Sequence, residues 1–322
     1  MPEQSSTNKN ALLPSPPPVI LCTGIAVLDF IFQVERFPTA STKAPTQQFV
    51  ITGGGCAANA AIAIVRLGGQ ARFCGPLGDD ETSCRIVQGL VDEGVNTDDV
   101  VWISGATASV SGVFIDPAGE RLLTTLREQG LAEARIANPA DLVRRVDAVL
   151  ADNHFAEFVL PICQAAACRG IHVVLDVDRP TEPSDPLFAC ASHTIFSAEA
   201  LKLTTGILQW ERALARAAEF CPGFVAVTNG AEGVLWREGN DVMQIPAFPV
   251  QAVDTLAAGD VFHAALALAL AEGSDETTAL RFANAAAALK CKRFGGIIGS
   301  PTRAEVEHLL TSAVKNNADD GS

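Results

Sequence analysis

The chain has 322 residues, 48% of them hydrophobic and 19% charged, so it can bury a sizeable core in one large domain or two ordinary ones. A formal net charge of −14 argues against a nucleic acid or an anionic membrane as a partner, because no basic surface would neutralise their phosphates. The nine cysteines are scattered without the spacing of a zinc site, which favours free thiols in a reducing compartment. The polar start does not look like a signal peptide, and no apolar run reaches the length of a membrane span. We therefore expect a cytoplasmic protein.

The first part of the chain predicts a tail, a buried strand and an irregular β segment. Residues 1–18 are polar and then proline-rich, so we expect a disordered tail before a strand at 19–24. Segments 30–52 and 103–126 contain short alternating strands joined by turns such as Asp116-Pro117-Ala118-Gly119. They predict a small sheet that projects from the main body. The regular elements between these segments are expected to be helices at 59–67 and 82–93 and a strand at 71–75.

The rest of the chain alternates between short apolar runs and helical stretches. The apolar runs lie at 148–151, 171–175, 194–196 and 224–227, and a hairpin is expected at 234–245. The helices are expected at 156–169, 199–204, 209–220, 258–272, 275–291 and 302–314. Continuous apolar strands separated by helices are typical of a parallel sheet covered on both faces. The sequence therefore predicts an α/β fold in one domain from 19 to 315, with a polar tail at 316–322.

The run Asp254-Thr255-Leu256-Ala257-Ala258-Gly259-Asp260 opens an almost wholly apolar helix. Such a helix should be buried, and the small residues at its start leave several backbone N–H groups without a side-chain cap. A helix start of this kind attracts an anion, yet Asp260 places a carboxylate in the same turn. An anion hole beside a carboxylate suits phosphoryl transfer, because the carboxylate can take the proton of the attacking hydroxyl. An ordinary helix start with a favourable charge is the alternative interpretation.

Other motifs near strand ends predict ligand contacts. Asp29 follows the first strand, and ligands bind at the carboxyl ends of parallel strands in such sheets. The loop Gly53-Gly54-Gly55 enters a helix that carries Asn59, which suits a close approach by a small polar ligand. The same loop also fits a packing turn, and it fits the dinucleotide pattern with Asp79 or Asp80 only weakly.

Two further segments suit contact with a nucleotide. Thr228-Asn229-Gly230 follows another strand and fits either a phosphate or ribose contact or an ordinary turn. Asn284 is a polar residue among alanines on a helix, where a structural role and a ligand contact are equally consistent with the sequence. His154 and His172 show no order typical of a nucleophilic triad.

Two of these motifs together resemble the signatures of the PfkB carbohydrate kinases, the ribokinase-like family. They are Gly54-Gly55-Cys56-Ala57-Ala58-Asn59 and Asp254-Thr255-Leu256-Ala257-Ala258-Gly259-Asp260, supported by Gly75–Asp80 and Gly94–Thr97. The resemblance implies a three-layer α/β/α fold with a mostly parallel central sheet and a small β-sheet lid over the sugar. It implies an ATP-dependent kinase that uses Mg²⁺, acts on a small sugar and forms a homodimer through the lid.

The resemblance also implies a role for individual residues. Asp260 would be the catalytic base, and the backbone of Ala257, Ala258 and Gly259 would form the anion hole for the transferring phosphate. The residues that would bind the sugar hydroxyls are Asp29, Gly54, Gly55 and Asn59. The residues that would lie along the ATP are Ser197, Thr228, Gly230 and Asn284.

The residues that would bind metal ions match the family pattern less closely. The family's N-x-x-E motif, which organises Mg²⁺-bound water, reads Ser197-Ala198-Glu199-Ala200 here. Glu199 is a candidate for the metal position, with Asp176 and Asp178 as alternatives. Asp254 and its neighbours resemble the loop that binds a monovalent cation such as K⁺ in some members.

The identity of the sugar stays open, and we expect a ketose or a related small sugar. Cys56 stands where ribokinase-type members often have a lysine. The chain looks most like the sulfofructose-kinase branch, in which a basic side chain binds a sulfonate. Arg127 and His154 lie near the matching place, so they are candidate contacts for an anionic substituent.

Two alternative functions stay open. A nucleoside kinase of the same fold would need an apolar or aromatic slot for a base, and the chain has no tyrosine. A non-catalytic sugar- or nucleotide-binding protein is favoured by the altered Ser197–Ala200 motif. The anion hole and Asp260 argue against it.

Overall fold

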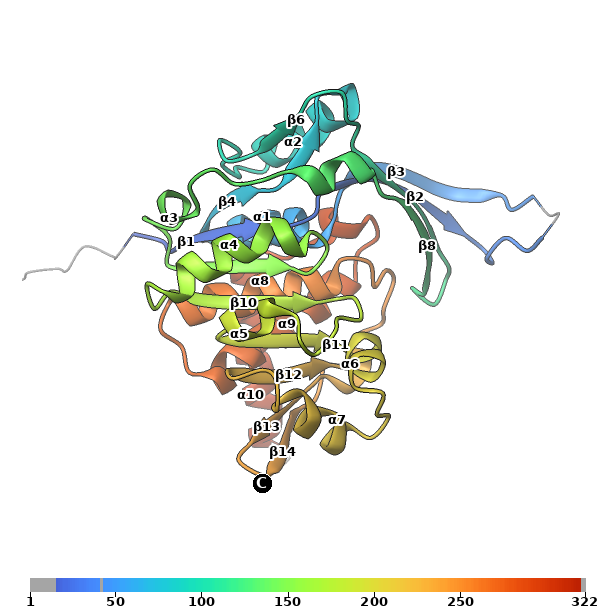
Figure 1. The fold of residues 1–322 in the computed structure, drawn as a ribbon. Coiled ribbons are helices and arrows are strands. Elements are labelled where there is room, and N and C mark those ends of the chain that lie inside the picture. The colour runs from blue at the N-terminus through green and yellow to red at the C-terminus, as the bar shows by residue number, and fades with distance from the viewer. Residues whose placement is uncertain (1–15, 41–42, 320–322) are drawn as a thin grey trace, which may run out of the picture.

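The structure is a computed structural model that describes residues 16–40 and 43–319, with side chains as far as residue 313 (Figure 1). The tails expected at 1–18 and 316–322 lie largely outside the described residues. A helix, α10 (Arg303–Asp319), continues into the second of these segments.

A sheet of eight strands forms the centre of the molecule, in the order β14-β13-β12-β11-β10-β9-β1-β4. All pairings from β4 to β12 are parallel, and β13 and β14 add antiparallel pairings at one edge. The strands are β1 (Val19–Thr23), β4 (Gln70–Cys74), β9 (Ala148–Asp152), β10 (His172–Val177), β11 (His193–Ser197), β12 (Phe224–Thr228), β13 (Val234–Glu238) and β14 (Asp241–Ile245). The predicted, mostly parallel sheet is confirmed.

Helices cover both faces of this sheet, which gives three layers (Figure 1). Alternate strand residues explain this, because Ile20 and Cys22 pack into one hydrophobic core and Leu21 packs into the other. The first core is closed by α1 (Cys56–Arg66), α8 (Ala258–Ala271), α9 (Glu276–Cys291) and α10. The second is closed by α4 (Ala156–Ala167), α5 (Pro186–Cys190), α6 (Ala198–Thr205) and α7 (Trp210–Ala217).

A second sheet projects from the body as a lid, in the order β3-β2-β7-β8 (Figure 1). Its strands are β2 (Val27–Val34), β3 (Thr46–Gly54), β7 (Ser109–Ile115) and β8 (Arg121–Leu126). Asp116 makes the turn between β7 and β8, because its Oδ1 accepts hydrogen bonds from the N–H groups of Ala118 and Glu120. The predicted small sheet is therefore confirmed. The stretch around Ile103 belongs instead to β6 (Val101–Ile103), which pairs with β5 (Pro76–Gly78), the strand that precedes α2 (Glu81–Asp92) in the chain.

The junction between lid and body is tight, and glycine is required there. Helix α1 begins at Cys56, three residues before its predicted start, after Gly55 at a φ of 93°. A Cβ on Gly55 would lie 2.6 Å from the carbonyl oxygen of Ile25. The chain can therefore turn from β3 into α1 only with glycine at this position.

Candidate active site

A cavity of about 1020 Å³ lies between the lid and the carboxyl edge of the central sheet. It brings together most of the residues that the sequence singled out, although they come from distant segments. Those that line it are Asp29, Gly55, Asn59, Arg127, His154, Ser197, Thr228, Gly230, Ala257, Ala258, Gly259, Asp260 and Asn284. Three expected residues do not line it: Gly54, Glu199 and Asp254.

The floor of the cavity is the N-terminus of α8. Ala257 precedes the helix with a φ of 64°, which makes it the only non-glycine residue with a positive φ in the described part of the chain. No side chain caps the helix, and the N–H groups of Gly259 and Asp260 have no acceptor among the described residues. The strained turn therefore aims free N–H groups into the cavity, as an anion hole requires.

Asp260 stands at the edge of this anion hole. Its Oδ2 accepts a hydrogen bond of 2.6 Å from the side-chain Nδ2 of Asn59 on α1. Burial raises the pKa of Asp260 to about 6, although the Asn59 bond acts in the opposite direction. The group is thus mostly ionised at neutral pH, yet more basic than an exposed carboxylate.

Asp29 enters the cavity from the lid strand β2. It is 5% exposed, and burial raises its pKa to about 7, against the effect of a hydrogen bond from Ser111. Gly54 makes room for this carboxylate, because a Cβ at position 54 would lie 2.1 Å from Oδ2 of Asp29. Gly54 thus shapes the site without lining it.

Asp152, at the end of β9, fixes the point where lid and body meet. Its Oδ2 accepts hydrogen bonds from the N–H groups of Ile25 at 2.8 Å and Ala57 at 3.2 Å. Its Oδ1 accepts one from the N–H of His154 at 3.0 Å. Both oxygens are occupied by the backbone, which indicates a structural role.

A cluster of acids and one thiol lies beside Asp260. Ligand atoms of Cys56, Asp176 and Asp260 lie within 4.8 Å of one another, and those of Cys56, His154 and Asp178 form a second group. Burial raises the pKa of the Cys56 thiol well above its usual value, so the thiol stays protonated. The carboxylates of Asp176 and Asp178 are the hard oxygen donors that Mg²⁺ prefers, and they fit such an ion better than the thiol does.

The polar residues expected along the nucleotide line the other end of the cavity. Ser197 caps α6 by accepting a hydrogen bond from the N–H of Ala200, and Asn284 donates to the carbonyl of Ile245 at 3.1 Å. Thr228 and Gly230 lie where β12 ends. Glu199 is exposed in the first turn of α6, outside the cavity.

Several residues of the site and its supports were not singled out in the sequence. Ser111 and Arg121 come from the lid, where nothing in the pattern separated them from other polar residues. His263 supports the anion hole, because its Nδ1 donates to the carbonyl of Gly259 at 2.7 Å, and burial lowers its pKa to about 4. The spacing of four residues between Gly259 and His263 was the available signal. Lys290 on α9 is fully buried against Asp254.

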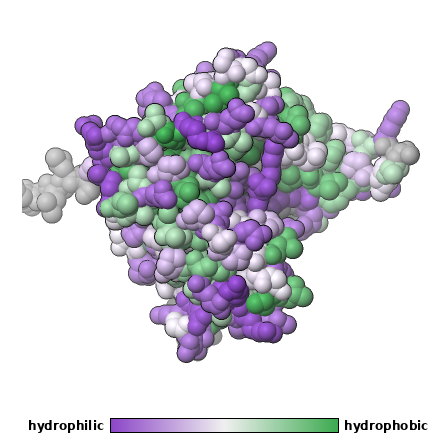
Figure 2. Space-filling model, in the orientation of Figure 1, coloured by the Kyte–Doolittle hydropathy of each residue, from purple (hydrophilic) through white to green (hydrophobic). Residues whose placement is uncertain are grey.

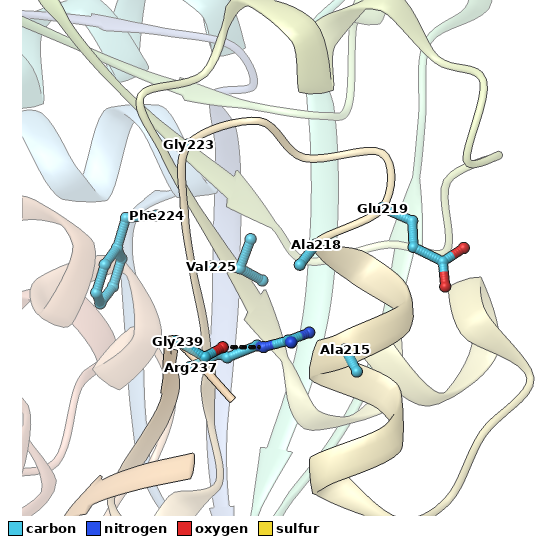
Figure 3. A pocket seen from close by; sticks show the side chains of 8 residues that line it. All are labelled: Ala215, Ala218, Glu219, Gly223, Phe224, Val225, Arg237 and Gly239. Atoms are coloured by element: carbon cyan, nitrogen blue, oxygen red, sulfur yellow. Dashed lines mark hydrogen bonds between the residues drawn. The ribbon is translucent and has the colours of Figure 1, made fainter. Parts of the chain in front are cut away.

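A smaller hollow of about 380 Å³ lies at the opposite edge of the sheet, between α7 and the start of β12 (Figure 3). Arg237 crosses it and donates to the carbonyl of Gly239 at 2.6 Å. Glu219 points away from it (Figure 3). This hollow presents no cluster comparable with the one around Asp260.

Comparison with known proteins agrees with this geometry. The family model described as "pfkB family carbohydrate kinase" matches residues 18–303, which is most of the chain. The chain belongs to this family. It is therefore a carbohydrate kinase of the PfkB type, a phosphotransferase with an alcohol acceptor, and its fold is ribokinase-like.

Several relatives of this PfkB kinase carry specific names. A ribokinase from Bacillus subtilis (strain 168) is 33% identical, over 91% of this chain and 99% of its own. Fructokinase-1 from Oryza sativa subsp. japonica is 29% identical, over 92% and 98%. Among solved structures, Arabidopsis thaliana ribokinase, complexed with ribose and ATP, has a TM-score of 0.78 at 27% identity, over 91% and 98%. These names give no support to the sulfofructose-kinase branch that the sequence suggested.

A further crystal structure, of a protein from Agrobacterium tumefaciens, has a TM-score of 0.87 at 36% identity and covers 93% of this PfkB kinase and 99% of that chain. In the described part of the kinase, no helix has the length and hydropathy that a membrane crossing requires.

Proposed function

We propose that this kinase transfers the γ-phosphate of ATP to a hydroxyl of a ketose or a related small sugar, with Asp260 as the general base. The observation that carries the proposal is the placement of a basic carboxylate beside the uncapped start of α8, inside a cavity that the lid covers. Relatives named ribokinase and fructokinase support a pentose or hexose acceptor.

The cavity offers a separate place for each substrate. The sugar would lie under the lid, with its hydroxyls on Asp29 and Asn59 and against the backbone of Gly55. The nucleotide would lie along Thr228, Gly230 and Asn284, with its γ-phosphate at the start of α8. Asp260 stands between the two.

In the transfer, Asp260 takes the proton of the sugar hydroxyl as that oxygen bonds to the γ-phosphorus and the bond to ADP breaks. The free N–H groups of Gly259 and Asp260 would stabilise the charge on the transferring group, whereas the N–H of Ala258, also expected in the anion hole, donates to the carbonyl of Thr255 at 3.3 Å. Asn59 holds the carboxylate in place through its 2.6 Å hydrogen bond. Asp176 and Asp178 would hold Mg²⁺, which when bound offsets the charge of the phosphates.

The test is a screen of ribose, fructose and related sugars for ATP-dependent phosphorylation, with wild type compared with Asp260→Asn. Loss of a positioned base should lower kcat roughly 10²–10⁴-fold. Asp241→Asn, on the exposed strand β14, is the matched control and should keep wild-type rates. Equal turnover by wild type and Asp260→Asn would sink the assignment, and so would binding of sugars without phosphorylation of any of them.

A second candidate substrate is a sugar with an anionic substituent, as in the sulfofructose-kinase branch. Arg127 lines the cavity, and it lies close enough to Arg179 to contribute to lowering the pKa of that guanidinium, after the effect of burial. Among the described residues neither guanidinium is within 4 Å of a carboxylate. Asp178 and Asp152 act in the opposite direction on Arg179, but two neighbouring guanidinium groups with no described carboxylate within 4 Å still favour an anionic ligand.

The screen should therefore include fructose carrying a phosphate or a sulfonate. If the anionic sugar is preferred, Arg127→Gln should raise its KM about tenfold or more and leave the KM of the neutral sugar unchanged. Arg169→Gln, on an exposed turn remote from the cavity, is the control. Equal KM values for the charged and the neutral sugar in wild type would remove this candidate.

A further inference from the structure

Lys290 is a fully buried lysine that lies under the active site. It belongs to α9 and is 0% exposed, as is its partner Asp254. The ammonium Nζ lies 2.8 Å from the carbonyl oxygen of Asp254 and 3.1 Å from its carboxylate Oδ2. A buried charge is costly unless it is paired and hydrogen-bonded, so this pair requires an explanation beyond ordinary packing.

Asp254 uses both carboxylate oxygens to fix the chain around the anion hole. Its Oδ1 accepts a hydrogen bond of 2.8 Å from the N–H of Leu256, the residue before Ala257. Its Oδ2 accepts bonds from the N–H groups of Gly295 at 2.9 Å and Gly296 at 2.8 Å. The carboxylate thus joins the anion-hole loop to the turn after α9.

The same loop is tied to α9 and to the lid. The N–H groups of Val253 and Asp254 both donate to the carbonyl of Cys291, at 2.7 and 3.2 Å. Thr255 donates from its backbone and its hydroxyl to the carbonyl of Gly119, in the turn between the lid strands β7 and β8. Lys290 therefore stands where the body, the lid and the anion hole are joined.

An exchangeable monovalent cation, expected at Asp254, does not fit this arrangement. Both carboxylate oxygens and the carbonyl oxygen of Asp254 already have partners, and one of these partners is a fixed positive charge. A second cation at the same oxygens would be repelled at contact distance in a buried region. The donor set thus belongs to an internal ammonium.

We propose that the Lys290 ammonium is a built-in cation that positions the Asp254 loop and hence the anion hole, so that activity needs no added monovalent cation. Lys290 is a positioning residue, since its ammonium acts on the site through Asp254. The inference rests on the proposed kinase function, and its thermal test below is independent of that function.

The first test needs only the wild type. Initial rates with Mg-ATP and the best sugar of the screen are measured in tetramethylammonium chloride, with and without added KCl, by direct detection of the sugar phosphate. We expect the rate to change less than about twofold. Activation by K⁺ of about tenfold or more would overturn the proposal.

The second test uses Lys290→Ala, with Lys290→Met and the exposed-site control Lys292→Ala. In tetramethylammonium chloride, Lys290→Ala and Lys290→Met should lose about 10²-fold in kcat with little change in KM, because the anion hole is displaced. Added K⁺ or NH₄⁺ should raise the kcat of Lys290→Ala at least about tenfold, because this variant leaves room for the ion. The same ions should not raise the kcat of Lys290→Met. Wild-type kcat in Lys290→Met would overturn the proposal.

The thermal unfolding midpoint gives a readout that does not depend on turnover. K⁺ should leave the Tm of wild type and Lys292→Ala unchanged relative to tetramethylammonium, and should raise the Tm of Lys290→Ala. If no sugar is phosphorylated, the proposed function fails while this measurement still decides the ion question. The proposal would be contradicted if K⁺ changed the Tm of wild type. It would also be contradicted if Lys290→Ala folded but K⁺ left its Tm unchanged. If Lys290→Ala does not fold in any salt, the wild-type Tm decides.

Discussion

At the residue scale, the proposed chemistry depends on carboxylates whose surroundings differ. Burial raises the pKa of Asp260 to about 6 and that of Asp29 to about 7, while the carboxylate of Asp254 is fully occupied by N–H donors and an ammonium. A carboxylate with a pKa near 6 is mostly ionised at neutral pH and accepts a proton more readily than an exposed carboxylate does.

The pH dependence of kcat should therefore show an acid limb. The base works only when ionised, so kcat should fall about tenfold per pH unit below about 6 and be level above it. The measurement is kcat at saturating sugar and ATP between pH 4.5 and 8. A flat profile across pH 6 would contradict the role of Asp260.

The raised pKa of Asp260 also predicts that replacing this carboxylate by an amide stabilises the fold. The folded pKa of Asp260 lies above the unfolded value of 3.8, so ionisation destabilises the fold above about pH 6, and this cost disappears as pH falls toward 4. Asp260→Asn should raise the free energy of unfolding by about 2 kcal/mol at pH 8 and by much less at pH 4. Denaturant unfolding at both pH values checks this, and a loss of stability at pH 8 would contradict it.

At the element scale, the sequence was sufficient to predict the strands of the central sheet and most helices, because their apolar runs reflect burial directly. Helix α8 was placed within one residue, since Ala258–Ala271 is apolar almost throughout. The start of α1 was placed three residues late, because Cys56-Ala57-Ala58 looked like a loop until Gly55 was seen to form the N-cap. The three-residue strands β5 and β6 carry too few side chains to give a periodic signal.

The junction of β3 and α1 gives a prediction with a matched control. Gly55→Ala places a Cβ 2.6 Å from the carbonyl oxygen of Ile25 at a φ of 93°, and should lower the free energy of unfolding by about 1–3 kcal/mol. Gly53→Ala adds a Cβ with nothing within 4 Å and should change it by no more than about 0.5 kcal/mol. Urea unfolding of both variants measures these free energies. Equal changes in the two variants would rule out the steric explanation.

At the scale of the whole molecule, the site exists only because distant segments meet. Asn59 and Asp260 are 201 positions apart, and the sequence linked them only through a family resemblance. Lys290 was missed because a lysine in a helix is ordinarily solvated, so only the tertiary structure shows that it is fully buried. Residue propensity and hydrophobic periodicity predict local secondary structure. They say little about which charged side chains come into contact in the folded protein.

The outer face of the lid is apolar and suits a second copy of the chain. In register, Phe49 faces Phe32, Phe32 faces Phe114, and Phe114 faces Leu122, on the side away from the cavity-lining Val113. Phe49 is 50% and Leu122 48% exposed, and hydrophobic residues gather over the lid (Figure 2). An exposed apolar row of this kind favours burial against another protein surface over contact with solvent.

We predict a homodimer through this row. Phe49→Glu with Leu122→Glu should shift the protein from dimer to monomer, because charges would be buried at the interface. Leu208→Glu is the control, since Leu208 is 72% exposed and remote from the lid. Light scattering on a sizing column gives the mass. A monomeric wild type, or a double variant that stays dimeric, would contradict the prediction.

The two carboxylates that we propose to face the sugar belong to different parts of the molecule. Asp29 belongs to the lid strand β2, whereas Asp260 belongs to α8 in the body, next to the nucleotide end of the cavity. If the lid swings outward, Asp29 leaves with it and the hydrogen bonds from Thr255 to the carbonyl of Gly119 break, while Asp254 and Lys290 keep the anion-hole loop joined to α9. We therefore expect the residence time of the sugar phosphate to be set by how often the lid opens.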